Sequence, residues 1–327
     1  MAQNQEQSGK LIMLKYRNSL PQLGDRFFLT DGGLETTLVF HQGFNLPQFA
    51  AFVLLKDIVG CQTLTEYFHS YARLAQKYRV GFILESVTWR ASRDWGFKLG
   101  YSPEDINAFN RLAIAILEDI REEYDSEQTP MIISGCLGPR GDGYNPTELM
   151  NEMEAEHYHT EQITVFAQTN ADLVTAMTIT YAEEAIGIAR AAQKAKIPVV
   201  ISFTVETNGK LPTGQSLPDA IASVDRATDN APIYYMINCA HPLHFAPILQ
   251  SGGDWIHRIK AIRANASIKS HAELDEAEEL DDGNPTELAL QYQKLKTLLP
   301  NLNIFGGCCG TDIRHIEEIS KAVLSFS

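Results

Sequence analysis

Short apolar runs alternate with longer amphipathic stretches along almost the whole chain. Each apolar run is four to seven residues long and reads as a strand buried on both faces. The runs cover residues 27–30, 81–85, 131–135, 172–176, 198–203, 233–239, 259–263 and 303–306. Eight such strands, each followed by a helical stretch, are typical of a parallel sheet covered by helices.

The helical stretches carry apolar residues on one face. Between Asp57 and Arg79 they include Ile58, Leu64, Phe68 and Tyr71 at helical spacing. Further helices are predicted to begin at residue 102 and to cover about 151–168, 182–195, 218–227, 242–249, 285–298 and 313–324. We therefore predict an α/β fold, a (β/α)8 TIM barrel, with an open doubly wound sheet as the alternative. Residues 1–20 read as a flexible lead-in, and 21–327 as a single (β/α)8 domain.

Composition narrows the classes of partner. The 327 residues are 44% hydrophobic and carry a formal net charge of −14, which argues against nucleic acid and anionic membranes. No apolar run is long enough to span a bilayer, and residues 1–10 lack the core of a signal peptide. Five cysteines do not form a disulfide framework, so a cytoplasmic protein with reduced thiols is expected. These properties are compatible with a homo-oligomer.

Three cysteines fall where the predicted strands end. Cys308 and Cys309 lie in a Gly-Gly-Cys-Cys-Gly-Thr stretch, and Cys239 ends the run 233–239. Adjacent thiols on a regular strand point to opposite faces, but flanking glycines allow the backbone to bring them together. The alternative is a pair of buried small apolar side chains. Three thiolates with an open fourth position favour catalytic zinc.

Other charged or metal-ligating groups carry a simpler interpretation. His241 and His244 follow Cys239 and could bind metal, but the glycine-framed cysteines are the better set. Residues 273–282 contain seven acids, a pattern that usually marks solvated surface. The same segment could instead face the mouth of the barrel and favour a cationic ligand.

The cysteine motifs resemble the homocysteine S-methyltransferase family. The resemblance rests on Asn238-Cys239 and on the stretch 306–311, and it extends from Asp31 to the C-terminal helix. It implies that Cys239, Cys308 and Cys309 bind Zn2+ in a barrel, and that a methyl group passes to the thiol of homocysteine to give methionine. One barrel fills almost the whole chain, so the expected donor is a small onium, S-methylmethionine or S-adenosylmethionine, rather than a methyl-folate or cobalamin.

The resemblance also implies substrate contacts. The expected set is Asp31, Thr88, Trp89, Asn238 and Asn265. Asp31 would contact the amino acid, although a turn-forming Asp is the alternative. Trp89 would hold a cationic donor on its ring, although a packing role is equally compatible. No catalytic residue is expected beyond the zinc site, and Cys61 and Cys136 are expected to be unligated.

One position departs from the family pattern. Met177 stands where the family has a Glu that recognises the substrate ammonium. Glu85 or Glu206, both near strand ends, could take that role. The alternatives are zinc-dependent alkylation of a different thiol, or a non-catalytic zinc-binding barrel.

Overall fold

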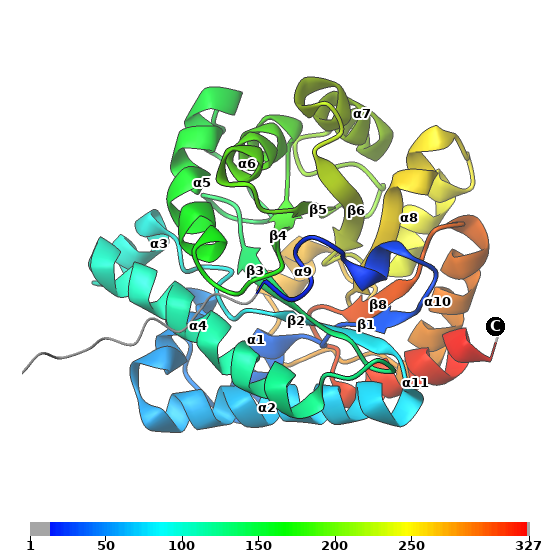
Figure 1. Cartoon of the computed structure of the whole chain (residues 1–327). Coiled ribbons are helices and arrows are strands. Elements are labelled where there is room, and N and C mark those ends of the chain that lie inside the picture. The colour runs from blue at the N-terminus through cyan, green and yellow to red at the C-terminus, as the bar shows by residue number, and fades with distance from the viewer. Residues whose placement is uncertain (1–13, 326–327) are drawn as a thin grey trace, which may run out of the picture.

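Eight parallel strands close into a barrel in this protein (Figure 1). The computed structural model describes residues 14–325. The strands, neighbours in chain order, are β1 (Phe28–Leu29), β2 (Gly81–Glu85), β3 (Met131–Leu137), β4 (Leu173–Ile179), β5 (Val199–Phe203), β6 (Pro232–Asn238), β7 (Ile259–Ala264) and β8 (Ile304–Gly307). The barrel closes where β1 pairs with β8. The predicted (β/α)8 fold is confirmed, and the open sheet is excluded.

Helices surround the barrel. They are α1 (Leu34–Thr36), α2 (Ile58–Tyr78), α3 (Arg93–Lys98), α4 (Pro103–Tyr124), α5 (Glu152–Ala167), α6 (Ala182–Ala195), α7 (Leu217–Thr228), α8 (Pro242–Leu249), α9 (His271–Asp275), α10 (Pro285–Leu298) and α11 (Ile313–Leu324). Short 3-10 helices span Pro21–Leu23, Pro47–Phe49, Ala51–Lys56 and Asp254–Arg258, and a π-helical turn spans Thr37–His41.

The core has two layers because the strands are apolar on both faces. Inside the barrel, at least one buried residue from each strand belongs to a common cluster. These residues include Phe28, Ile83, Ile132, Leu173, Val200, Tyr234, Ala261 and Ile304. A second and larger cluster packs the outer strand faces against the helices. Side chains therefore fill the barrel, and only its two ends are free for binding.

Local signals set the helix ends. Ser102 caps α4, and Pro103 lies in the first turn. The Ser102 hydroxyl accepts a hydrogen bond from the Asp105 backbone N–H, and the Asp105 carboxylate accepts one from the Ser102 backbone N–H. The Asp57 side chain accepts from Gly60 N at the start of α2. Arg79 ends the same helix in the left-handed conformation, at φ 55°. Helix bounds predicted from the sequence are thus close to those observed.

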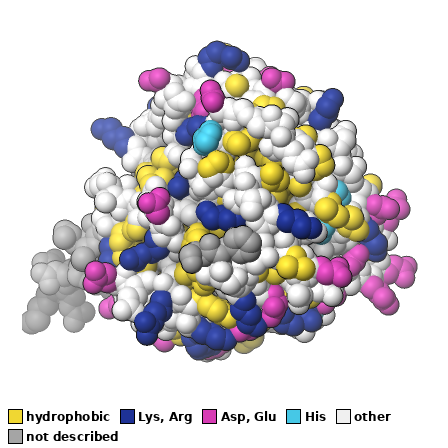
Figure 2. All heavy atoms as spheres, turned by 90° about the vertical axis from the view of Figure 1, so that its right-hand side faces the viewer, with side chains coloured by type: hydrophobic (Ala, Val, Ile, Leu, Met, Phe, Trp, Pro, Cys, Tyr) yellow, Lys and Arg dark blue, Asp and Glu magenta, His cyan; other side chains and the backbone are white. Residues whose placement is uncertain are grey.

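The described part of the predicted lead-in is bonded to the barrel. The Tyr16 backbone N–H donates to Asp172, at 3.0 Å, and the Arg17 guanidinium donates to the carbonyls of Ala167, Thr169 and Ala171. Residues 1–13 of that lead-in lie outside the described residues. Within residues 14–325, no helix has both the length and the apolarity needed to cross a membrane. The outer face in Figure 2 carries side chains of both charges.

Candidate metal and substrate site

Three cysteine sulfurs converge at the carboxyl-end mouth of the barrel. Cys239 directly follows β6, and Cys308 and Cys309 directly follow β8. The sulfur atoms of all three lie within 4.8 Å of one another. Within residues 14–325, no other three side chains of the metal-ligating kinds converge in this way. His241 and His244 are not part of the cluster, and His244 Nε2 bonds the Ile268 carbonyl instead.

The backbone leaves strand geometry at these cysteines. Cys239 has φ 53° and Gly310 has φ 78°, both in the left-handed region. Cys308 N donates to the Ala264 carbonyl at 2.8 Å, which fixes the turn against β7. A side chain at Gly307 would collide with Thr311, whose hydroxyl caps the Cys308 carbonyl. The glycine frame noted in the sequence therefore permits the close approach that brings the thiols together.

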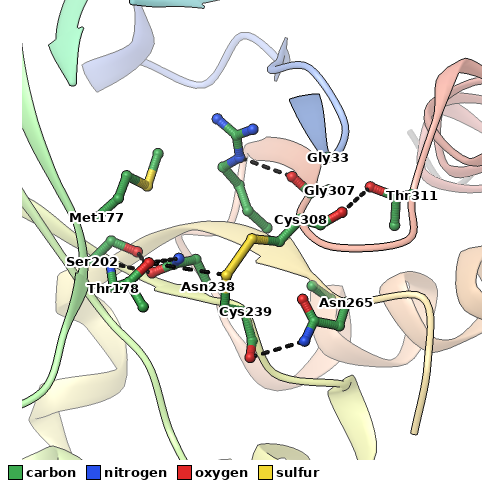
Figure 3. Close-up of a disulfide and its surroundings, with 12 residues drawn as sticks. Gly33, Met177, Thr178, Ser202, Asn238, Cys239, Asn265, Gly307, Cys308 and Thr311 are labelled. Carbon is green, nitrogen blue, oxygen red and sulfur yellow. Dashed lines mark hydrogen bonds between the residues drawn. A yellow bond between two sulfur atoms is a disulfide. The ribbon is translucent and has the colours of Figure 1, made fainter. Parts of the chain in front are cut away.

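Cys239 and Cys308 form a disulfide, so the expected reduced state of these two thiols is wrong for this structure (Figure 3). The physical reason is the proximity of the strand ends. The Cα atoms are 5.4 Å apart, within the range that a disulfide bridges. Cys61, Cys136 and Cys309 are free thiols. All three sulfurs therefore become available together only after this disulfide is reduced.

The sulfur cluster fits a zinc ion. At a Zn–S distance of about 2.3 Å, tetrahedral geometry places the sulfurs about 3.8 Å apart. In the observed cluster all three sulfurs lie within 4.8 Å of one another, but Cys239 and Cys308 are bonded to each other, so reduction must separate that pair before the three sulfurs can take this spacing. Burial raises the pKa of the Cys309 thiol to about 11, and the nearby Glu35 carboxylate adds to the rise. A cation among the sulfurs is therefore needed to hold this group as a thiolate at neutral pH.

Asn238 holds the metal-ligand turn in place (Figure 3). Its Nδ2 donates to Thr178 Oγ1 at 2.8 Å, and its Oδ1 accepts from Thr178 N at 3.0 Å and from Ser202 Oγ at 2.6 Å. Thr178 lies at an irregularity in β4 and has φ 62°, which is rare for a β-branched residue. Its Oγ1 is 4.0 Å from Cys239 Sγ. Asn238 thus orders the residues around the sulfur.

Asn265 supports the same turn and also faces the site. Its Nδ2 donates to the Cys239 carbonyl at 3.1 Å, while its Oδ1 is buried and has no hydrogen-bond partner. Asn265 is 2% exposed and lines the cavity in front of the sulfurs. Buried polar atoms without a partner are uncommon, so this oxygen is available to a ligand donor.

Asp31 already has two strong partners. Its Oδ1 lies 2.7 Å from the Arg263 guanidinium, and its Oδ2 accepts from the Tyr67 hydroxyl at 3.0 Å. Arg263 also donates to the Gly32 and Gly307 carbonyls. The sequence analysis missed Arg263, because a single Arg within an apolar strand gives no periodic signal. The expected Asp31–ammonium contact would have to share the carboxylate with this guanidinium.

A cavity of about 430 Å³ opens in front of the sulfurs. Seven acidic side chains but only two arginines line it. The acids are Asp31, Glu35, Glu85, Asp142, Asp275, Glu279 and Asp281, and the arginines are Arg90 and Arg263. Three of the acids come from the acidic run at 273–282, which therefore faces the mouth rather than bulk solvent alone. Tyr144, which the sequence did not single out, also lines the cavity and packs against His271, with ring centres 4.4 Å apart and ring planes tilted by 47°.

Of the two predicted substrate contacts that follow β2, one lines the cavity and the other does not. Trp89 lines the cavity, but the Arg90 guanidinium lies 4.5 Å from its ring and its Nε1 donates to the Met177 carbonyl. Thr88 is fully buried outside the cavity lining and donates to the Cys136 carbonyl at 2.7 Å. The structure brings Asp31, Trp89, Asn238 and Asn265 to the cavity with the cysteines, and it does not bring Thr88 there.

The two alternative acids have different surroundings. Glu85 lines the cavity and is 6% exposed, and Met177 lines the same cavity. Glu206 does not line it, and its carboxylate lies 3.5 Å from His271 Nδ1. The structure therefore favours Glu85 over Glu206 as a group that meets a ligand.

A parallel (β/α)8 barrel with a sulfur-rich, acidic cavity at its carboxyl end has the layout of a barrel enzyme. The sequence profile of a family described as homocysteine S-methyltransferase matches residues 28–323. Because the match covers most of the chain, this protein belongs to the homocysteine S-methyltransferase family and is a methyltransferase.

Two solved structures share the fold. The metallated form of the homocysteine methyltransferase MmuM from Escherichia coli is 16% identical, with a TM-score of 0.69 over 91% of this chain and 96% of that one. The oxidized form of the same protein is 18% identical, with a TM-score of 0.72 over 95% and 99%.

Proposed function

We propose that this protein transfers a methyl group from a small onium donor to the thiol of homocysteine, giving methionine, at a zinc ion held by Cys239, Cys308 and Cys309. The observation that carries the proposal is the convergence of three cysteine sulfurs at the floor of an acidic cavity at the barrel mouth. Bound zinc would lower the pKa of the substrate thiol, so that it reacts as a thiolate.

The chain's own residues would order the site. Asn238 and Thr178 hold the turn at Cys239, and Asn265 bonds the carbonyl of that residue. The cavity walls hold thiol and donor in one orientation, which supplies part of the rate enhancement. The substrate sulfur attacks the methyl carbon while the bond from that carbon to the onium atom breaks. The electron pair leaves with the departing group, so no protein base is needed at the methyl group.

The excess of acids supports a cationic donor. Seven carboxyl groups face two guanidinium groups in the cavity lining. A sulfonium or quaternary ammonium is attracted to such a lining, whereas a polyanionic donor would be repelled. S-methylmethionine and S-adenosylmethionine both carry the required charge.

A second candidate substrate is a thiol other than homocysteine. Met177 cannot pair with an ammonium, and Asp31 is already bonded to Arg263. This alternative keeps the metal site and the donor but removes amino acid recognition. A non-catalytic barrel is less well supported, because a cavity opens directly in front of the sulfurs and a structural zinc site normally has four protein ligands.

A thiol-by-donor screen tests the proposal. Reduced, zinc-loaded protein is incubated with homocysteine or amino-free thiols and with S-methylmethionine, S-adenosylmethionine, betaine or methyltetrahydrofolate, and products are identified by mass spectrometry. We expect methionine from homocysteine with a sulfonium donor. Turnover with methyltetrahydrofolate alone, or no turnover with any donor, would contradict the proposal.

Variants at the cysteines test the metal site separately. Changing Cys239, Cys308 or Cys309 to Ala should remove most of the zinc, which is expected at about one ion per chain in the reduced wild type. Cys61→Ala is the matched control, because Cys61 is a free thiol outside the cluster. Zinc content is measured by atomic absorption, and full occupancy in Cys308→Ala would defeat the assignment.

A further inference from the structure

The proposed function leaves the substrate ammonium without an evident partner. Asp31 is bonded to Arg263 and Tyr67, and Met177 offers only a thioether. Met177 is 6% exposed, so an ammonium in contact with it would lose much of its hydration. A buried, unpaired ammonium is strongly unfavourable, so the cavity must supply another acid.

Glu85 is a buried acid with one carboxylate oxygen that has no hydrogen-bond partner. It is the last residue of β2, is 6% exposed, and lines the cavity. Its Oε2 atom is buried and makes no hydrogen bond. Buried polar atoms nearly always have partners in the folded state, so an unpartnered carboxylate oxygen on a cavity wall indicates a ligand contact.

Of the two buried acids near Arg263, only Asp31 forms an ion pair with it, and Glu85 does not. Arg263 is the buried cation near both Asp31 and Glu85. Its hydrogen bonds and ion pair go to Asp31 and to the carbonyls of Gly32 and Gly307, and none goes to Glu85. Burial raises the pKa of the Glu85 carboxyl to about 7, while Arg263 and hydrogen bonds from the Ser134 and Thr175 side chains oppose that rise. These hydroxyl groups carry no charge, so they leave the carboxylate without a bonded cation. A ligand cation at this carboxylate would complete the charge balance.

We propose that Glu85 binds the α-ammonium of the amino acid thiol and thereby sets the preference of this enzyme for homocysteine over thiols without an amino group. This inference rests on the proposed function. Glu85, Cys136 and Met177 lie on the consecutive strands β2, β3 and β4 and line one cavity. The acid that β4 lacks is thus supplied by β2, on the same side of the barrel mouth.

Equilibrium binding of two thiols tests the assignment. Homocysteine is compared with 4-mercaptobutanoate, which has the same chain and carboxylate but no amino group, by calorimetry on reduced, zinc-loaded protein. The measured quantity is the ratio of the two dissociation constants. We expect the wild type to prefer homocysteine and Glu85→Gln to lower that preference by at least about tenfold.

Three further variants make the result specific. Glu206→Gln, outside the cavity, should keep the wild-type ratio, and Glu35→Gln, on the cavity wall, should lower it less than Glu85→Gln does. Adding Met177→Glu to Glu85→Gln should restore part of the preference, because it returns an acid to the same wall. An unchanged ratio in Glu85→Gln, or loss of the ratio in Glu35→Gln instead, would overturn the proposal.

Failure of the role assigned to Glu85 can be distinguished from failure of the proposed methyl transfer. If the wild type methylates no thiol in the screen described above, the proposed function fails whatever Glu85 does. If the wild type methylates both thiols and Glu85→Gln leaves the binding ratio unchanged, the proposed function stands and the role of Glu85 is wrong.

Discussion

At the scale of single residues, the site depends on which buried charges are already paired. Asp31 forms an ion pair with Arg263, whereas Glu85 forms none within residues 14–325 and has one carboxylate oxygen without a hydrogen bond. This distinction could not be predicted from the sequence, in which both acids simply follow or end apolar runs. The sequence did identify the three cysteines, because thiols at strand ends are recognisable without knowledge of their partners. It could not set their redox state, which depends on the distance between two turns.

The role of Glu85 predicts a pH dependence. Its carboxyl, with a pKa of about 7 in the folded protein, is ionised above that pH and neutral below it. The charges of the neighbouring groups do not change in this range. Arg263 stays cationic and is paired with Asp31. Burial raises the pKa values of Cys136 and Tyr234, so these two groups stay neutral. The preference for homocysteine over 4-mercaptobutanoate should therefore fall as the pH decreases from about 8 to 6.

Calorimetry across that pH range checks this expectation. Using the ratio of the two thiols largely cancels the titration of the thiol itself. Glu85→Gln should show a flat ratio. A wild-type ratio that rises on acidification, or an equal slope in Glu85→Gln, would rule out titration of Glu85 as the cause.

At the scale of elements, the strands and the long helices could be predicted from the sequence, whereas the irregular segments could not. Strands buried on both faces give continuous apolar runs, and α2 and α4 give clear periodicity and caps. The short helices α3 and α9 contain too few turns to show a period. The irregularity at Thr178 places a β-branched residue at positive φ, a conformation that its residue type argues against. That irregularity lies beside the metal ligands.

Asn238 should therefore contribute measurably to stability. Replacing Asn238 by Ala removes its bonds to Thr178 and Ser202 and leaves the buried Thr178 N–H without a partner. We expect the free energy of unfolding to fall by about 1–3 kcal/mol.

Urea denaturation of the reduced protein measures this change. Ser202→Ala, which removes one of these bonds, is the graded control and should cost only about 1 kcal/mol. Equal stability of Asn238→Ala and the wild type would show that the network does not hold the turn.

At the scale of the whole molecule, acidity and barrel topology act together. The chain carries a net charge of −14, and seven of its 41 acidic side chains line the cavity at the mouth of the barrel. The barrel itself could be predicted because eight strand–helix units leave few topologies. The orientation of the acidic segment could not, since a run of acids looks the same whether it faces solvent or a cavity.

The acidic mouth predicts weaker donor binding when its charge is removed. Glu279→Gln should raise the KM for a sulfonium donor by a factor of only about 2–5, since Glu279 is exposed and solvent screens its charge. Steady-state kinetics at low ionic strength provides the measurement. Glu278→Gln is the matched control, because Glu278 is exposed and lies outside the cavity lining. An equal effect of both variants would point to general charge rather than to the cavity.

The most direct test of the central claim is the number of sulfur atoms bound to zinc before and after homocysteine is added. X-ray absorption at the zinc edge of the reduced, zinc-loaded protein measures it, with Cys61→Ala as the control. We predict three sulfur ligands from Cys239, Cys308 and Cys309 in the free enzyme and a fourth when homocysteine binds. Four sulfurs in the free enzyme, or no change on adding homocysteine, would contradict a site in which the substrate thiol binds the metal before it accepts the methyl group.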